Sequence, residues 1–161
     1  MTEEVKRAYW QGFRDGAPFF IVLTPFALLF GVVATEAGLS VAQTIGFSFL
    51  VIAGASQFTA IQLMTENAPV FIVILAALAV NLRMAMYSAS LAPYLGRAPL
   101  GTRMLIAYFN VDQTFAMGSV KYETEPDLSV PDRVSYFAGL ATPVMIAWYL
   151  SSLAGALFGQ A

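Results

Sequence analysis

The sequence predicts an all-α fold, a polytopic transmembrane helix bundle with about five spans and some proline-broken helices. The first indication is composition, because only 11% of the 161 residues are charged and 58% are hydrophobic. A soluble domain carries about 25% charged residues. The second indication is three long stretches without any charge, which are Gly16–Thr35, Ala37–Thr65 and Val134–Ala161. Since about 20 apolar residues cross a bilayer, we expect a single membrane domain over residues 1–161.

Residues 1–16 precede the first span and are predicted to be a cytoplasmic or interfacial segment. Charged residues from Glu3 to Asp15 come before a long apolar run, which differs from the short basic start of a signal peptide. Val5, Tyr9 and Phe13 recur every four residues, a spacing that suits a short helix lying among lipid headgroups. The alternative is a frayed cytosolic tail.

Polar and proline-containing separators divide the rest into five spans, and boundaries of this kind are accurate to about two to four residues. The predicted spans cover residues 17–35, 41–64, 70–91, 104–120 and 136–158. The separators are Thr35–Gly38, Glu66–Pro69, Pro93–Arg103 and an acidic loop from Lys121 to Arg133. Helices are expected rather than barrel strands, because the spans lack the alternation of apolar and polar residues that lipid-facing strands show.

The distribution of basic residues predicts that the N-terminus is cytoplasmic. With that orientation the cytoplasmic side holds five basic residues near the span ends, which are Lys6, Arg7, Arg14, Lys121 and Arg133. The opposite side holds Arg97 and Arg103. Lys and Arg accumulate on the cytoplasmic side of membrane proteins, so the count favours this orientation.

Pro25, Gly54 and Pro143 are predicted to interrupt helices. A proline inside a helix removes one backbone hydrogen bond and frees a carbonyl group, and secondary transporters form binding sites at such broken helices. Ordinary kinks are the alternative. Small residues also recur on the last span, at Ser151, Gly155 and Gly159, which permits close approach of a neighbouring helix or of a partner subunit.

Polar side chains inside the predicted spans are the candidates for a functional site. Arg83 and Asp112 are ionisable, and a charged group at mid-span costs about 2.5–3.5 kcal/mol on insertion scales, so such groups are functional candidates. Neutral polar residues accompany them. We therefore predict a substrate-binding or coupling site containing Ser56, Gln57, Asn81, Arg83, Tyr87, Asn110, Asp112 and Gln113. The alternatives are a buried pair of Arg83 with Asp112 and hydrogen bonds that only hold helices together.

Composition also excludes several kinds of chemistry. Because the chain has no Cys and no His, it cannot form a tetrahedral zinc site or a Ser-His-Asp triad. It lacks a GxxxxGK phosphate-binding loop, so ATP binding is not expected. A net charge of -2 argues against nucleic-acid binding. We therefore expect neither an enzyme nor a protein with a metal or cofactor.

The polar residues suit a small zwitterionic substrate. A carboxylate would interact with Arg83 or with a half-helix N-terminus, and an ammonium group would interact with Asp112 or with freed carbonyls. An aliphatic side chain would contact the Phe, Leu and Met residues of the spans. Asp112 is alternatively the group that couples transport to proton movement.

Several stretches resemble the AzlC family, the large subunit of bacterial branched-chain amino acid exporters. They are GAPFFIVLTPFALLFG (Gly16–Gly31), AGASQFTAIQLM (Ala53–Met64), NLRMAMYSASLAP (Asn81–Pro93) and DQTFA (Asp112–Ala116). The resemblance implies export of valine, leucine, isoleucine and methionine across the bacterial inner membrane. It also implies an ion gradient as the driving force and a small hydrophobic AzlD-like partner subunit.

The sequence departs from the family pattern at two points. Met84 stands where the family commonly has His, so a proton-relay role of that His has no carrier in this sequence. The family's large subunits usually continue with further hydrophobic spans, so the sequence resembles a member shortened after Ala161. Two other functions stay open from the residues alone, a passive small-solute channel and a structural membrane subunit.

Overall fold

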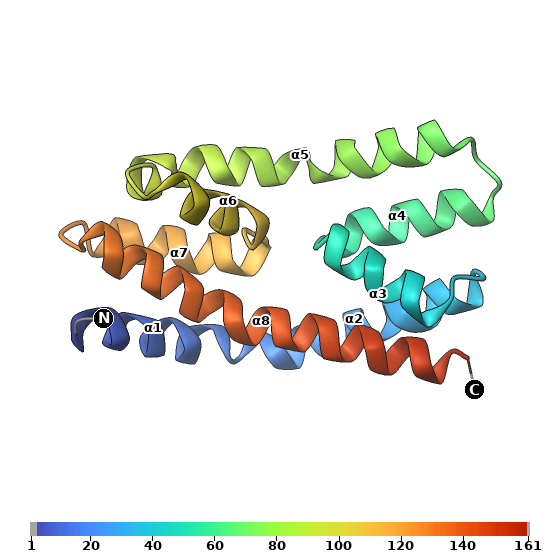
Figure 1. Cartoon of the computed structure of the whole chain (residues 1–161), viewed down its shortest axis with the longest axis horizontal. Helices are drawn as coiled ribbons and strands as arrows, with labels where there is room; N and C mark the ends of the chain where they lie inside the picture. The colour runs from blue at the N-terminus through green and yellow to red at the C-terminus, as the bar shows by residue number, and fades with distance from the viewer. Residues whose placement is uncertain (1–2, 161) are drawn as a thin grey trace. The chain divides into compact units, whose positions relative to one another are not determined.

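The computed structural model describes residues 3–160, and the regular structure in this range is entirely helical (Figure 1). The all-α prediction is therefore confirmed. The helices are α1 (Glu3–Gly16), α2 (Phe19–Glu36), α3 (Val41–Leu50), α4 (Gly54–Thr65), α5 (Val70–Leu95), α6 (Leu100–Tyr108), α7 (Asp112–Thr124) and α8 (Val130–Phe158).

Three of these helices, α2, α5 and α8, are long and apolar enough to cross a membrane. They correspond to the first, third and fifth predicted spans, with ends that coincide or differ by up to six residues. Helix α5 continues to Leu95 and contains Pro93, while α8 begins at Val130. The charge-free stretches therefore located α2 and most of α8, whereas α5 lies outside them and contains Arg83.

The second and fourth predicted spans are each two helices rather than one, which corrects the prediction. Residues 51–53 separate α3 from α4, and residues 109–111 separate α6 from α7. Five of these six residues are Val, Ile, Ala or Phe with no helix-breaking chemistry of their own, and no proline lies in either break. The hydropathy of the sequence therefore gives no sign that the helix stops at either break.

The helix interruptions predicted at Pro25 and Pro143 are absent, because α2 and α8 continue through these prolines. A proline removes one backbone donor, and neighbouring packing in a membrane bundle tolerates this loss. Gly54 differs, since it is the first residue of α4 directly after a break. The predicted acidic loop from Lys121 to Arg133 is also shorter, because helices α7 and α8 leave only residues 125–129 between them.

The chain packs as two compact units, and both α5 and α8 contribute to each. The first unit contains the chain up to Phe20 together with Met84–Met145. The second contains Ile21–Arg83 and the chain from Ile146 onward. Each unit thus has its own broken pair of helices, α6 with α7 in the first and α3 with α4 in the second. The single membrane domain expected from the sequence stays a prediction.

In the first unit α1 is a packed helix rather than a frayed tail. It lies against α8 at a contact between glycines: a Cβ atom on Gly12 would overlap the carbonyl oxygen of Tyr136, and one on Gly139 would overlap that of Tyr9. The Ser135 hydroxyl also donates to the carbonyl oxygen of Val5 at 2.6 Å. The unit's core is mainly aromatic and aliphatic: Leu91, Leu95, Tyr122, Tyr136, Phe137, Leu140 and Ala141.

In the second unit the small residues of α8 pack against α2. A Cβ atom on Gly155 would overlap the carbonyl oxygen of Leu28, and one on Gly31 would overlap that of Ser152. The stripe of small residues predicted on the last span is therefore, at Gly155, a contact inside the protein. Beside this contact, Phe30 is fully buried and packs against Trp148 with ring centroids 6.5 Å apart.

Candidate functional site

In the first unit, polar side chains gather where α6 ends and α7 begins. Asp112 is the first residue of α7, and the Tyr87 hydroxyl of α5 donates a hydrogen bond to its Oδ1 at 2.8 Å. The Tyr87 ring stacks on Phe115 with centroids 4.2 Å apart, which fixes the direction of its hydroxyl. The structure thus brings together two residues that are 25 positions apart and that were both predicted site residues.

Asn110 lies in the break itself and is 1% exposed. Its Nδ2 donates to the Ser88 hydroxyl at 3.3 Å, whereas its Oδ1 is buried without a hydrogen-bond partner among residues 3–160. Gln113 is half-buried at the second position of α7. Leaving a buried amide oxygen without a hydrogen bond costs about 1–3 kcal/mol of stability. A ligand that donates a hydrogen bond to the Oδ1 of Asn110 would recover this free energy.

An open cavity of about 250 Å³ lies between α5 and α6 beside Asn110. Its lining is mostly apolar and includes the exposed residues Ala92, Arg103 and Ala107. Because these residues are exposed, the cavity is a groove on the surface of the unit rather than an enclosed site. Its charged lining residue, Arg103, was not predicted as a site residue.

In the second unit, the break between α3 and α4 precedes Ser56 and Gln57. The Ser56 hydroxyl donates to the carbonyl oxygen of Ala77 at 2.8 Å, which joins α4 to α5. Gln57 is 0% exposed, and neither its Oε1 nor its Nε2 has a hydrogen-bond partner in the part of the chain that the structure describes. Ser56 therefore anchors the helix, whereas Gln57 leaves its hydrogen-bonding capacity unused.

Asn81 and Arg83 lie on the same unit's part of α5. Helices α4 and α5 are antiparallel and side by side (Figure 1), and Ala77 marks the level of Ser56. Asn81 is one turn beyond Ala77 on the same face, which places it level with the break at residues 51–53. The Asn81 Oδ1 atom is buried and has no hydrogen-bond partner within residues 3–160.

Trp148 of α8 belongs to this neighbourhood and was missed from the sequence. A Cβ atom on Gly54 would lie 2.9 Å from the Cη2 atom of the Trp148 ring, so the ring covers the first residue of α4. Trp148 is 6% exposed, and its indole nitrogen is buried without a hydrogen-bond partner among the described residues. A tryptophan in an apolar span looks like ordinary core, so no sequence signal marks this one.

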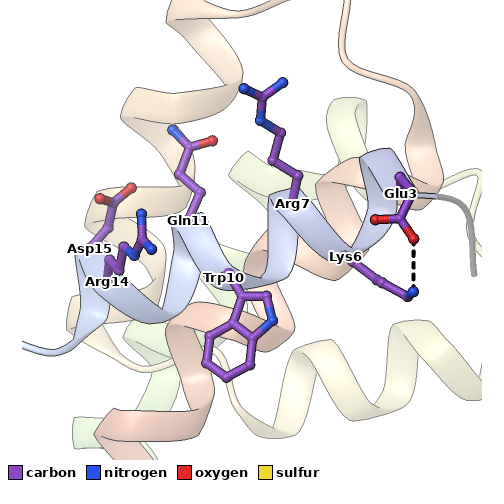
Figure 2. A pocket seen from close by; sticks show the side chains of 7 residues that line it. All are labelled: Glu3, Lys6, Arg7, Trp10, Gln11, Arg14 and Asp15. Atoms are coloured by element: carbon purple, nitrogen blue, oxygen red, sulfur yellow. Dashed lines mark hydrogen bonds and ion pairs between the residues drawn. The ribbon is translucent and has the colours of Figure 1, made fainter.

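A groove of about 810 Å³ lies along the polar face of α1. Figure 2 shows Arg7 and Gln11 on one side of the helix and Trp10 on another, with Lys6 paired to Glu3 at 2.8 Å. The groove's lining residues all come from this single helix. A surface formed by one helix does not enclose a small molecule, so we place the candidate site at the helix breaks instead.

Comparison with known proteins agrees with the resemblance described above. The sequence model of the AzlC protein family matches residues 18–161. The chain belongs to the AzlC family. The chain is also 26% identical over 153 residues to the inner membrane protein YgaZ of Escherichia coli strain K12. No solved structure matches the chain.

The match to YgaZ covers 94% of the chain but only 61% of YgaZ, so the chain spans about three fifths of this AzlC-family relative. The family and the apolar helices together support a membrane location and a role related to membrane transport. All four motifs that carried the resemblance fall wholly or almost wholly inside the matched range. Both helix breaks lie inside it as well.

Proposed function

We propose that this AzlC-family chain is a subunit of a secondary transporter that exports branched-chain amino acids, namely valine, leucine and isoleucine, and also methionine. Its location would be the bacterial inner membrane with the N-terminus in the cytoplasm. An ion gradient drives export, and a small AzlD-like subunit is the partner. The observation that carries the proposal is a buried amide with unsatisfied polar atoms at each helix break: both amide atoms of Gln57 in one unit and the Oδ1 of Asn110 in the other.

Unsatisfied amide atoms at both breaks favour a binding role over a purely structural one. A structural polar group stabilises the fold by forming hydrogen bonds, whereas Gln57 and the Oδ1 of Asn110 form none within residues 3–160. Ser56 already fulfils the structural role on α4 through Ala77. The unused hydrogen bonds are therefore available to a polar ligand that enters between apolar helices.

The arrangement around Asp112 suits ion coupling. A carboxylate at the first turn of a helix is stabilised by the helix dipole, and the Tyr87 hydroxyl donates to it directly. Movement of a proton or another cation to this carboxylate would break or redirect that hydrogen bond. The bond joins α5 to α7, so binding at Asp112 would be transmitted to two helices of the same unit.

Counterflow in proteoliposomes tests the proposed function. The chain is reconstituted with and without an AzlD-like subunit, and uptake of labelled valine is measured against leucine, methionine, lysine and glutamate as competitors. Saturable counterflow that leucine and methionine compete for, and that lysine and glutamate do not, is the expected result. Flux that does not saturate would indicate a passive channel and would overturn the proposal.

Two kinds of variant separate a transport role of the charged residues from a structural one. Arg83→Ala and Asp112→Asn are expected to abolish counterflow while the protein still inserts into the membrane. The double variant Arg83→Met with Asp112→Leu removes both charges and keeps apolar volume, a change that buried ion pairs often tolerate. Wild-type counterflow in the double variant would show that the two charges serve only the structure.

A further inference from the structure

The first turn of α4 has backbone donors without a partner inside the helix. The first intrahelical hydrogen bond runs from the nitrogen of Gln57 to the carbonyl oxygen of Ala53 at 3.0 Å. The preceding N–H groups, from Gly54 to Ser56, have no carbonyl four residues earlier in the helix. The N-cap residue is Ala53, and no side chain caps this end of the helix. This end of α4 therefore carries an uncompensated partial positive charge.

The geometry of a helix is expected to bring the Gln57 side chain near these donors. Side chains in a helix tilt toward its N-terminus, so the amide of Gln57 lies over the turn that begins at Gly54. It is 0% exposed, and among residues 3–160 it has no hydrogen-bond partner for either amide atom. Leaving a buried amide without hydrogen bonds destabilises the protein. The Nε2 of Gln57 adds one donor group to those of the backbone at this turn.

The residues around this turn suit an anion with an apolar tail. The Trp148 ring covers Gly54, while Phe30 packs against Trp148 and against Phe58 of α4. Ala55 is exposed and Gly54 is partly exposed, whereas Ser56 is buried, so the turn is open to the outside of the unit at its first two residues. The first turn of α4 holds no acidic residue.

The corresponding turn in the first unit differs in charge. Helix α7 also begins after a three-residue break and also lacks a capping side chain, but its first residue is Asp112. A carboxylate already occupies the positive end of that helix and would repel a second anion. Only the break before α4 is thus free of negative charge in the described part of the chain.

We propose that the break before α4 binds the α-carboxylate of the transported amino acid, through the backbone N–H groups of Gly54–Ser56 and the Nε2 of Gln57. The inference rests on the proposed function, because it names the place where one group of the proposed substrate, its carboxylate, binds. The Oδ1 of Asn81, level with the break, is an acceptor that suits the neighbouring ammonium group. Trp148 and Phe58 provide apolar surface for the aliphatic side chain.

The test is equilibrium binding of three probes to the chain in lipid nanodiscs, together with its AzlD-like subunit. The probes are leucine, leucinamide, which lacks the carboxylate, and 4-methylpentanoate, which lacks the ammonium group. Gln57→Glu places a carboxylate on the same helix end and acts as a built-in competitor. Gln62→Glu is the matched control, because it makes the same charge change on the exposed part of α4.

Wild-type protein is expected to bind leucine at least about tenfold more tightly than leucinamide, equivalent to about 1.4 kcal/mol. Gln57→Glu is expected to weaken binding of leucine and 4-methylpentanoate by about tenfold or more and to leave leucinamide binding unchanged. Gln62→Glu should leave all three affinities as in the wild type.

Two other results overturn the inference. Equal affinity of the wild type for leucine and leucinamide would overturn the carboxylate assignment without any variant, so the test does not depend on the folding of Gln57→Glu. Equal leucine affinity in Gln57→Glu and Gln62→Glu would overturn it as well, while the proposed function would stand. Absence of binding of all three probes to the wild type would overturn the proposed function itself.

Discussion

The contact between α1 and α8 allows a quantitative prediction for Gly139→Ala. A methyl group on Gly139 would overlap the carbonyl oxygen of Tyr9 and lie 2.9 Å from the nitrogen of Phe13. Both atoms belong to the backbone of α1, so no side chain can rotate away. The helix must move as a whole, and we expect α1 to separate from α8.

The cost follows from the hydrogen bonds that hold α1. The Ser135 hydroxyl donates to the Val5 carbonyl at 2.6 Å, and the Tyr136 hydroxyl donates to Asp15 at 2.8 Å. The hydroxyls of Tyr9 and Thr142 form a third bond at 2.9 Å. Each bond contributes about 1 kcal/mol net, so separating α1 costs about 3 kcal/mol, and absorbing the overlap instead costs about 1–3 kcal/mol. The cheaper response sets the cost at about 1–3 kcal/mol, and at roughly 2–4 °C per kcal/mol the melting temperature should fall by roughly 2–12 °C.

The matched control is Gly101→Ala in α6, where a Cβ atom would have no neighbour within 4 Å. Alanine is favoured over glycine in helices, so this variant should not lower the melting temperature. Separation of α1 is measured directly by cysteine labelling, because the chain contains no Cys. Ala8→Cys, which packs against the core of the first unit, should react slowly with a maleimide and should become reactive in Gly139→Ala. Gln11→Cys, which is exposed, should react rapidly in both backgrounds.

An unchanged melting temperature in Gly139→Ala, together with continued protection of Ala8→Cys, would refute the close packing of these helices. A lower melting temperature without faster labelling would show that the helices absorb the overlap while α1 stays in place. Equal destabilisation in Gly101→Ala would refute the argument from contact distance, because the control site is open.

The remaining predictions concern Tyr122 and the membrane orientation. The Tyr122 hydroxyl donates to the carbonyl oxygen of Arg133 at 2.9 Å, so Tyr122→Phe should cost about 1 kcal/mol near pH 8 in thermal unfolding. Burial raises the pKa of Tyr122 above its usual range, so the pKa is higher in the folded than in the unfolded protein. The stabilisation by the Tyr122 hydroxyl is therefore complete below pH ~10 and is lost above it. Wild type should therefore lose its advantage over Tyr122→Phe at higher pH, and a constant difference would contradict the assignment. For the orientation, an impermeant maleimide added to intact spheroplasts should label Arg97→Cys but not Glu4→Cys, and the reverse pattern would place the N-terminus outside.

The sequence was sufficient to predict the long helices. Helices α2, α5 and α8 coincide with charge-free or nearly charge-free runs because a membrane-spanning helix must be apolar over its whole length. The regular spacing of Val5, Tyr9 and Phe13 likewise predicted a helix at the N-terminus, although its close packing on α8 depends on Gly12 and Gly139. Glycines 127 positions apart give no sign in one sequence that they meet.

Apart from Gly54, which marked the end of the first break, the two breaks could not be predicted because their residues do not disfavour helix by themselves. Ile52 and Ala53 are buried in the second unit, and Val111 is buried in the first, so tertiary packing sets the local backbone. Conversely, Pro25 and Pro143 signalled breaks that the packed helices do not have. Local chemistry alone therefore misplaced the interruptions.

The polar residues that the sequence singled out acquire different meanings from their positions. Gln57 and Asp112 both follow a helix break, yet one is a neutral amide near an uncapped positive helix end and the other already neutralises such an end. A transporter of zwitterions must recognise a carboxylate and must also respond to a cation. The position of Gln57 suits the first task and that of Asp112 suits the second. Replacing Gln57 should therefore change which ligands bind, whereas Asp112→Asn should abolish transport and leave the preference for a carboxylate in binding.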